Sequence, residues 1–182
     1  MRLKQLLTKK KSEIVGQWFD ALVNTYPPDT ARFLKSQPDS LANPVGSTAR
    51  QTLDGLYDEL TGDADPANLS RILDPLIRIR AVQLLFTPAK ALGFILEIKS
   101  IVRNQLGNRA DDPALVSSLT RFDKKVDRAL LVAFDGFQGC REHIYHLKAT
   151  EEQSKIYKAF ARAGLVAENP DNPDASDGSG GT

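Results

Sequence analysis

Apolar residues recur along most of the chain at the three- and four-residue spacing of an α-helix. The first such stretch covers residues 3–25 and ends at Tyr26-Pro27-Pro28. Its expected inward positions are Leu7, Ile14, Trp18, Leu22 and Val23. A short helix that Asp29 can cap is predicted next, with Ala31, Phe33 and Leu34 facing inward.

Four later helices are each preceded by a polar residue that is followed by proline. The dipeptides are Asn43-Pro44, Asp65-Pro66, Thr87-Pro88 and Asp112-Pro113. A side-chain oxygen at the N-cap accepts from a free helical N–H, and proline in the next position lacks a donor that would be unpaired anyway. The predicted helices cover residues 44–61, 66–83, 88–106 and 113–163. Gly62 and Gly107 are expected to end the first and third of these.

The inward faces of these helices follow from the same spacing. Val82 is expected to be buried near the end of the 66–83 helix, and Phe134 and Phe137 in the last helix. Pro75 lies inside the 66–83 helix, where it removes a backbone donor. No alternating, strand-like segment is found. The predicted fold class is all-α, a globin-like bundle of about six helices with a long C-terminal helix.

The last helix would be about 75 Å long at 1.5 Å per residue. It is either continuous or broken near Ala149-Thr150. Beyond Leu147 its apolar residues thin out to Ile156, Tyr157 and Phe160, a narrow stripe that is typical of packing on a partner helix. We therefore expect a homodimer formed through this helix.

The 182-residue chain divides into three parts on this basis. Residues 1–148 form a helical domain, residues 149–167 extend the last helix, and residues 168–182 are an acidic tail that is expected to be disordered. The N-terminus lacks the apolar core of a signal peptide, and the longest apolar run, 129–134, is far too short to span a membrane. No membrane insertion and a cytoplasmic location are expected.

The overall charge of +1 conceals an uneven distribution. The four acidic residues of the tail are Glu168, Asp171, Asp174 and Asp177. Without them, the 24 basic residues face 23 − 4 = 19 acidic ones, a body charge of +5. That excess is too small and too dispersed to predict a nucleic-acid partner. The sequence also lacks a P-loop, a dinucleotide fingerprint and a nucleophile elbow, so neither an enzyme nor a cofactor is expected.

The single cysteine and both histidines lie close together in the last helix, as Cys140, His143 and His146. Cys140 and His143 are neighbours on a helix, but His146 is rotated about 240° from Cys140, so the three do not converge on one ion. The main expectation is a buried Cys140 beside exposed histidines, with no metal. The alternative is a redox- or metal-responsive module that uses Cys140 and His143. Haem is not expected, because no histidine precedes residue 143.

Two arginines two positions apart, Arg78 and Arg80, must point to different faces of their helix. One should be solvated, and the other should hold a carboxylate or the carbonyls of a helix end, with ligand binding as the alternative. If a pocket exists, we expect it between the first, fourth and last helices, around Trp18, Arg80 and Cys140.

Five segments together resemble the RsbRD N-terminal domain family, the input domain of RsbR-like stressosome co-antagonist proteins. They are WFDALVNTYPPDTARFLK (18–35), ANPVG (42–46), IRIRAVQ (77–83), TPAKALGFILEIK (87–99) and CREHIY (140–145). The resemblance implies a globin-like, haem-free, dimeric module for signal input or docking. In the full stressosome proteins a linker helix leads to a STAS domain that engages a kinase. Here only the tail follows the helix, which argues against direct kinase antagonism.

These observations favour a non-enzymatic regulatory or sensory module that interacts with an unidentified protein partner. Ligand or partner binding would shift the packing of helices, and the last helix would transmit the shift.

Overall fold

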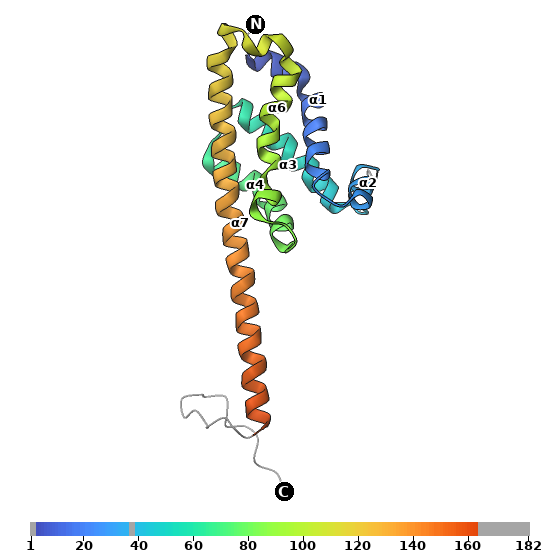
Figure 1. Ribbon diagram of the computed structural model, residues 1–182, viewed down its shortest axis with the longest axis vertical. Helices are drawn as coiled ribbons and strands as arrows, with labels where there is room; N and C mark the ends of the chain where they lie inside the picture. Colours follow the sequence, from blue (N-terminus) through green and yellow to red (C-terminus); the bar gives the residue numbers. More distant parts are fainter. Residues whose placement is uncertain (1–2, 37–38, 164–182) are drawn as a thin grey trace. The chain divides into compact units, whose positions relative to one another are not determined.

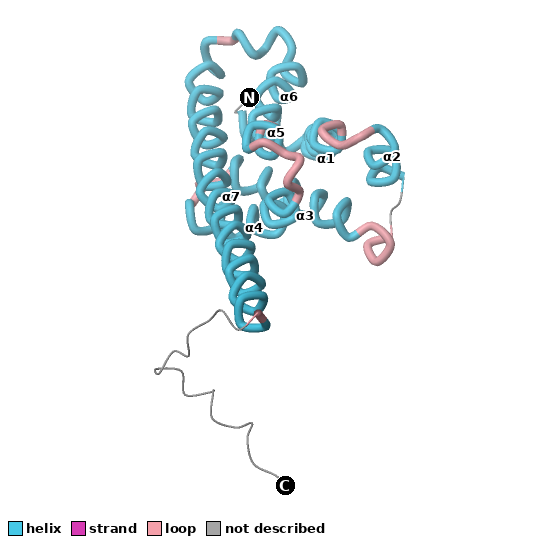
Figure 2. The backbone as a smooth tube through the Cα atoms, turned by 60° about the horizontal axis from the view of Figure 1, so that its bottom comes forward, coloured by secondary structure: helices cyan, strands magenta, loops and turns pink. Residues whose placement is uncertain are grey.

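The structure, a computed structural model, describes residues 3–36 and 39–163. These residues form seven α-helices, one 3₁₀ turn and no strand (Figures 1 and 2). The elements are α1 (Leu3–Val23), α2 (Pro28–Ser36), α3 (Pro44–Thr61), α4 (Pro66–Val82), α5 (Pro88–Leu92), α6 (Phe94–Leu106), the 3₁₀ turn Gly107–Asp111 and α7 (Pro113–Arg162). The prediction of an all-α fold with a long last helix is confirmed. The helices are consistent with the globin-like bundle that was expected. None of these helices is long and apolar enough to cross a membrane.

The predicted helix starts are confirmed by their hydrogen bonds. Asn43 Oδ1 accepts from the backbone N–H of Gly46 over 2.8 Å, and Asp65 Oδ2 accepts from that of Asn68 over 3.0 Å. Thr87 Oγ1 and Asp112 Oδ1 accept in the same way at the starts of α5 and α7. The side-chain acceptor and the proline therefore fix where each helix begins.

The segment predicted as one helix over 88–106 is instead two, because it is interrupted at Gly93. The backbone N–H of Gly93 donates to Ala89 O over 2.8 Å, and a Cβ at this position would lie 2.8 Å from the same oxygen. Only glycine allows so close an approach. The break explains why the described chain has seven α-helices rather than about six.

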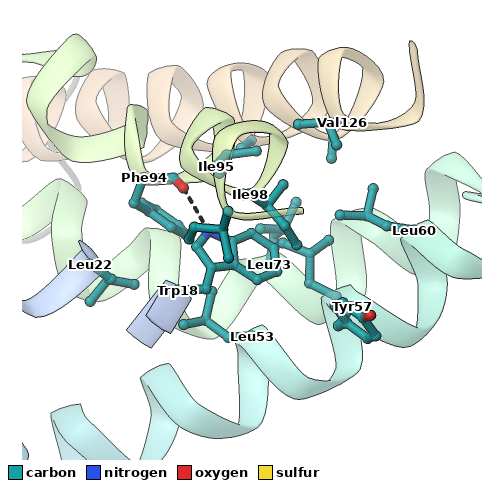
Figure 3. Packing of buried hydrophobic residues seen from close by; sticks show 14 of the residues in the cluster. Trp18, Leu22, Leu53, Tyr57, Leu60, Leu73, Phe94, Ile95, Ile98 and Val126 are labelled. Atoms are coloured by element: carbon teal, nitrogen blue, oxygen red, sulfur yellow. Dashed lines mark hydrogen bonds between the residues drawn. The ribbon is translucent and has the colours of Figure 1, made fainter. Parts of the chain in front are cut away.

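The core of the first compact unit, Met1–Glu142, is assembled around Trp18 of α1. Figure 3 shows its indole packed among side chains of α3, α4 and α6, including Leu53, Leu73 and Ile98. All of these side chains are fully or almost fully buried. The burial of large apolar groups from four helices is the main favourable contribution to folding this unit.

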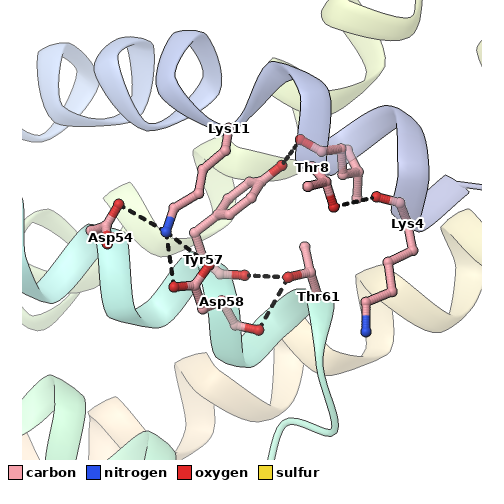
Figure 4. A network of polar contacts seen from close by, with 8 residues as sticks. Lys4, Thr8, Lys11, Asp54, Tyr57, Asp58 and Thr61 are labelled. Carbon is pink, nitrogen blue, oxygen red and sulfur yellow. Dashed lines mark hydrogen bonds and ion pairs between the residues drawn. The ribbon is translucent and has the colours of Figure 1, made fainter.

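Polar contacts connect the outer face of α3 to α1 (Figure 4). Lys11 Nζ lies 3.0 Å from Asp54 Oδ1 and 2.8 Å from Asp58 Oδ1. The buried Tyr57 hydroxyl donates to the carbonyl oxygen of Leu7 over 2.9 Å. Asp54 and Asp58 of α3 thus belong to a solvent-facing network that holds two helices together.

Three residues predicted to face the core are exposed: Phe33 (48%), Val82 (63%) and Phe134 (44%). Each lies next to positions that take the inward face. In α4 the buried positions near Val82 are Arg80 and Ala81, and in α7 Phe134 directly follows the buried Ala133. The periodicity predicted the helices of these three residues correctly, but it did not predict how many neighbouring positions on each helix are buried.

α7 is continuous from Pro113 to Arg162, with no break near residues 149–150. Its buried positions are Leu115, Leu119, Phe122, Val126, Ala129, Ala133, Phe137 and Arg141. The alternation of three- and four-residue steps indicates a narrow contact stripe. All of these residues belong to the first unit. In the second unit, His143–Thr182, every described residue from 145 to 163 is exposed.

The expected division at residue 148 stays a prediction, and the expected acidic tail, 168–182, lies outside the described residues.

Candidate functional site

The most unusual group of the first unit is the guanidinium of Arg80, which is fully buried in the last turn of α4. Its Nε donates to Ala91 O over 2.6 Å, and its Nη2 donates to Lys90 O over 2.9 Å. These carbonyls belong to α5, whose last turn leaves them without helical partners. Nη2 also donates to Thr25 Oγ1 over 2.9 Å. Arg80 therefore ties α4, the end of α5 and the segment after α1 together.

Aromatic rings surround the same guanidinium. Its Cζ lies 4.5 Å from the ring centroid of Phe86, 5.2 Å from that of Tyr26 and 5.5 Å from that of Phe94. The rings of Tyr26 and Phe86 also meet edge to face, with centroids 5.2 Å apart. The negative faces of aromatic rings stabilise a cation where water is excluded.

No carboxylate forms an ion pair with Arg80 within residues 3–36 and 39–163. All of its hydrogen-bond acceptors are neutral oxygens. Burial lowers the pKa of the Arg80 guanidinium, and the neighbouring Tyr26 offsets part of that effect. Burying a charge without a counter-ion is unfavourable in free energy, so the Arg80 guanidinium carries a large desolvation penalty.

Several buried polar atoms near this site have no hydrogen-bond partner in the described part of the chain. They are Arg80 Nη1, Tyr26 Oη, Gln83 Oε1 and Arg141 Nε. Native proteins rarely leave such atoms unpaired. Two of them, Arg80 Nη1 and Tyr26 Oη, belong to side chains that contact each other.

A second buried arginine, Arg141 of α7, contacts the backbone of Phe86. Its Nη2 donates to Phe86 O over 2.7 Å and lies 3.4 Å from Gln83 O. The Arg80 guanidinium stacks on the ring of the same Phe86. The segment between α4 and α5 thus connects the buried charge of α4 to α7.

The prediction for the two neighbouring arginines is confirmed. Arg78 is exposed and pairs with Asp74, at 2.7 Å from Nε to Oδ2. That carboxylate raises the pKa of Arg78. Arg80 points inward and holds the carbonyls of a helix end, as the sequence indicated.

The structure brings Trp18 and Arg80 together through Phe94. Trp18 Nε1 donates to Phe94 O over 2.7 Å (Figure 3). The Phe94 ring in turn contacts the Arg80 guanidinium. Cys140 lies on α7 and is half-buried against the core, while His143 and His146 are exposed. That Trp18, Arg80 and Cys140 share one pocket stays a prediction.

A surface hollow of about 610 Å³ lies over the Arg80 cluster. Its lining residues are Ala21, Asn24, Thr25, Tyr26, Pro27, Ala89, Lys90, Gly93, Phe94 and Glu97. Four of them, Thr25, Tyr26, Lys90 and Phe94, also contact the guanidinium. The volume is in the range of small-molecule sites, which is roughly 300–1,000 Å³.

The sequence did not point to three members of this site. Tyr26 was interpreted only as the end of the first helix, and Phe86 and Arg141 carry no local signal. The pairing of Arg80 with rings far along the chain depends on the tertiary fold. Among the described residues, no group of three or more Cys, His, Asp or Glu side chains could hold a metal ion. The redox or metal role of Cys140 and His143 stays a prediction.

Comparisons with known proteins find a family whose model matches most of the chain. Residues 12–151 match the RsbT co-antagonist protein rsbRD N-terminal domain family. The chain is also 23% identical over 150 residues to an uncharacterized protein of Archaeoglobus fulgidus, and the match covers 80% of this chain and 87% of that protein. No solved structure matches the chain. The family match spans most of the sequence, and the chain belongs to the RsbRD N-terminal domain family.

Proposed function

We propose that this protein is a cytoplasmic, non-enzymatic regulatory module of the stressosome-input type, which acts as a homodimer and binds a protein partner. Membership of the RsbRD N-terminal domain family supports a sensory role. The observation that carries the proposal is an apolar face on the second unit, where Tyr145, Ile156 and Phe160 are each at least half exposed.

These three side chains lie on one face of α7. Residue 156 is 11 positions after residue 145, which is close to three helical turns, and residue 160 follows one turn later. Large apolar side chains repeated on one exposed face mark an interaction surface. A second copy of the same helix supplies a matching stripe, and a twofold pair buries each stripe against the other.

The double variant Ile156→Glu/Phe160→Glu tests the dimer. Charges placed on a buried helix pair oppose each other, so we expect the variant to be monomeric at concentrations where the wild type is dimeric. Light scattering over a concentration series measures the mass. Ser154→Glu is the matched control, since residue 154 lies about 180° around the helix from residue 145 and should leave the dimer intact.

A monomeric wild type at high micromolar concentration would contradict the proposal. Partner binding is tested separately by pull-down from native lysate with the intact chain and with a chain cut after residue 148. We expect the partner to be lost on truncation, because the cut removes Ile156 and Phe160 from the apolar face of α7.

A further inference from the structure

We propose that the Arg80 cluster is a binding site for a small organic carboxylate, which reaches the guanidinium through the hollow over Tyr26 and Lys90. The inference goes beyond the proposed function, because a module of this kind could dimerise and bind a protein without any small ligand. Its test does not depend on the dimer.

The Arg80 guanidinium has no carboxylate partner among the described residues. Arg80 is fully buried, and within the described residues it contacts only neutral oxygens and aromatic rings. Arginine presents a planar fork of donors that matches a carboxylate in geometry as well as in charge. A carboxylate at Nη1 would supply the absent negative charge and use a donor that now has no partner.

The Tyr26 hydroxyl offers a further donor beside the Arg80 guanidinium. The Tyr26 side chain lies against the Arg80 guanidinium and raises its pKa, and the buried Tyr26 hydroxyl has no partner at good hydrogen-bond geometry in the described part of the chain. A phenolic O–H and a guanidinium N–H can both donate to one carboxylate. Thr25 and Tyr26 line the hollow and also contact the guanidinium, so they lie between Arg80 and the opening.

Apolar side chains near the guanidinium could contact the carbon chain of an organic acid. Phe86 and Phe94 form an apolar wall beside the guanidinium, and Ala21, Pro27 and Ala89 line the hollow. Inorganic phosphate has no apolar part to place there, whereas the carbon chain of an organic acid does. Lys90 at the opening adds a positive charge that attracts an anion.

Ligand binding at this site would affect the contacts of α7 through Phe86. Arg80 stacks on the Phe86 ring, and Arg141 of α7 donates to Phe86 O over 2.7 Å. A carboxylate that draws the guanidinium away from the ring would alter the contact that holds Arg141. The site is therefore placed to influence the first unit's part of α7.

The test is a titration of the wild-type chain with sodium butyrate, followed by the fluorescence of its only tryptophan. Trp18 donates to Phe94 O, and Phe94 lines the hollow, so the indole reports on the site. Sodium chloride at matched ionic strength and sodium phosphate are titrated in parallel. We expect a saturable change with butyrate, none with chloride, and weaker binding of phosphate.

Tyr26→Phe is the decisive variant, because it removes only a hydroxyl without a partner and keeps the ring contacts. We expect its affinity for butyrate to fall about tenfold, as for a lost hydrogen bond to a charged group. Lys90→Gln should weaken binding by a smaller factor, and Arg80→Met should abolish it. Ser154→Glu, on the exposed part of α7 and outside its apolar face, is the control and should bind like the wild type.

Equal responses to butyrate and chloride would overturn the proposal and leave Arg80 as a purely structural helix cap. Unchanged butyrate affinity in Tyr26→Phe would also overturn it. Tighter binding of phosphate than of butyrate would exclude an organic acid as the ligand class. If Arg80→Met does not fold, Tyr26→Phe and Lys90→Gln decide the question by themselves.

Discussion

Arg80 Nε donates a hydrogen bond to Ala91 O over 2.6 Å, so a buried side chain of α4 caps the five-residue helix α5. Such a short helix is only marginally stable by itself. A cation at its C-terminus satisfies free carbonyls and interacts favourably with the helix dipole. The geometry of α5, and with it the floor of the hollow, therefore depends on one guanidinium.

Replacement of this guanidinium should destabilise the first unit. Arg80→Leu leaves the carbonyls of Lys90 and Ala91 buried without donors, and we expect a loss of about 2–4 kcal/mol in the free energy of unfolding. Arg80→Lys keeps one donor and should lose less. Urea unfolding followed by circular dichroism measures both. Equal stability of the wild type and Arg80→Leu would show that α5 is held by other contacts.

Trp18 should be the most sensitive apolar position of α1. Trp18→Phe removes both buried ring volume and the hydrogen bond to Phe94 O, and we expect it to cost about 2 kcal/mol. Phe33→Ala is the matched control, because its ring is about half exposed and its loss should change stability by less than about 0.5 kcal/mol. A larger effect at Phe33 than at Trp18 would contradict the described core.

Tyr57 should make the free energy of unfolding depend on pH in the alkaline range. Burial, with a smaller contribution from Asp58, raises the pKa of Tyr57 above its ordinary value. As the pH rises, the unfolded chain releases the Tyr57 proton near pH of about 10, before the folded chain does. The contribution of Tyr57 to the free energy of unfolding is therefore full below that pH and decreases above it.

The measurement compares the wild type with Tyr57→Phe. At neutral pH the variant should be less stable by about 1 kcal/mol, because it lacks the hydrogen bond to Leu7 O. The difference should shrink above pH of about 10, by at most about 1.4 kcal/mol per pH unit. A constant difference across that range would show that the hydroxyl titrates normally in the folded protein.

Two glycines should respond in opposite directions to alanine. Gly107 ends α6 at φ 55° and ψ −137°, a conformation that residues with a Cβ rarely adopt, so Gly107→Ala should cost about 1–3 kcal/mol. Gly139 lies inside α7, where an added Cβ would meet only open space, so Gly139→Ala should stabilise by about 0.5–1 kcal/mol. Thermal unfolding of both variants checks the sign of each change.

Removal of residues 149–182 should leave the first unit folded. The last buried residue of α7 is Arg141, and the described residues from 149 onward are all exposed. We expect the free energy of unfolding to change by less than about 0.5 kcal/mol, measured at a concentration where both chains are monomeric. A much larger loss would mean that the end of α7 contributes to the core.

Helix positions were the most predictable part of the structure. The start of α3 at Pro44 and its end at Thr61 were expected because Asn43, Pro44 and Gly62 act on their own backbone neighbours. The division at Gly93 was missed because it depends on the contact with Ala89 O and on the capping of α5 by Arg80.

The candidate site was less predictable. One inward arginine was expected from the sequence, because two arginines two positions apart cannot share one helix face, and Arg80 was named for the expected pocket. Its neighbours Tyr26, Phe86 and Arg141 were not, since they come from segments far apart in the chain.

The sequence by itself determined the all-α fold, the helix starts and the opposite directions of Arg78 and Arg80, since caps, prolines and periodicity act over a few neighbouring residues. Only the tertiary structure decided what surrounds the buried guanidinium, because packing brings distant rings and carbonyls together. It also decided that the charge has no carboxylate partner among the described residues, because the acidic side chains near it in sequence point to solvent or pair elsewhere.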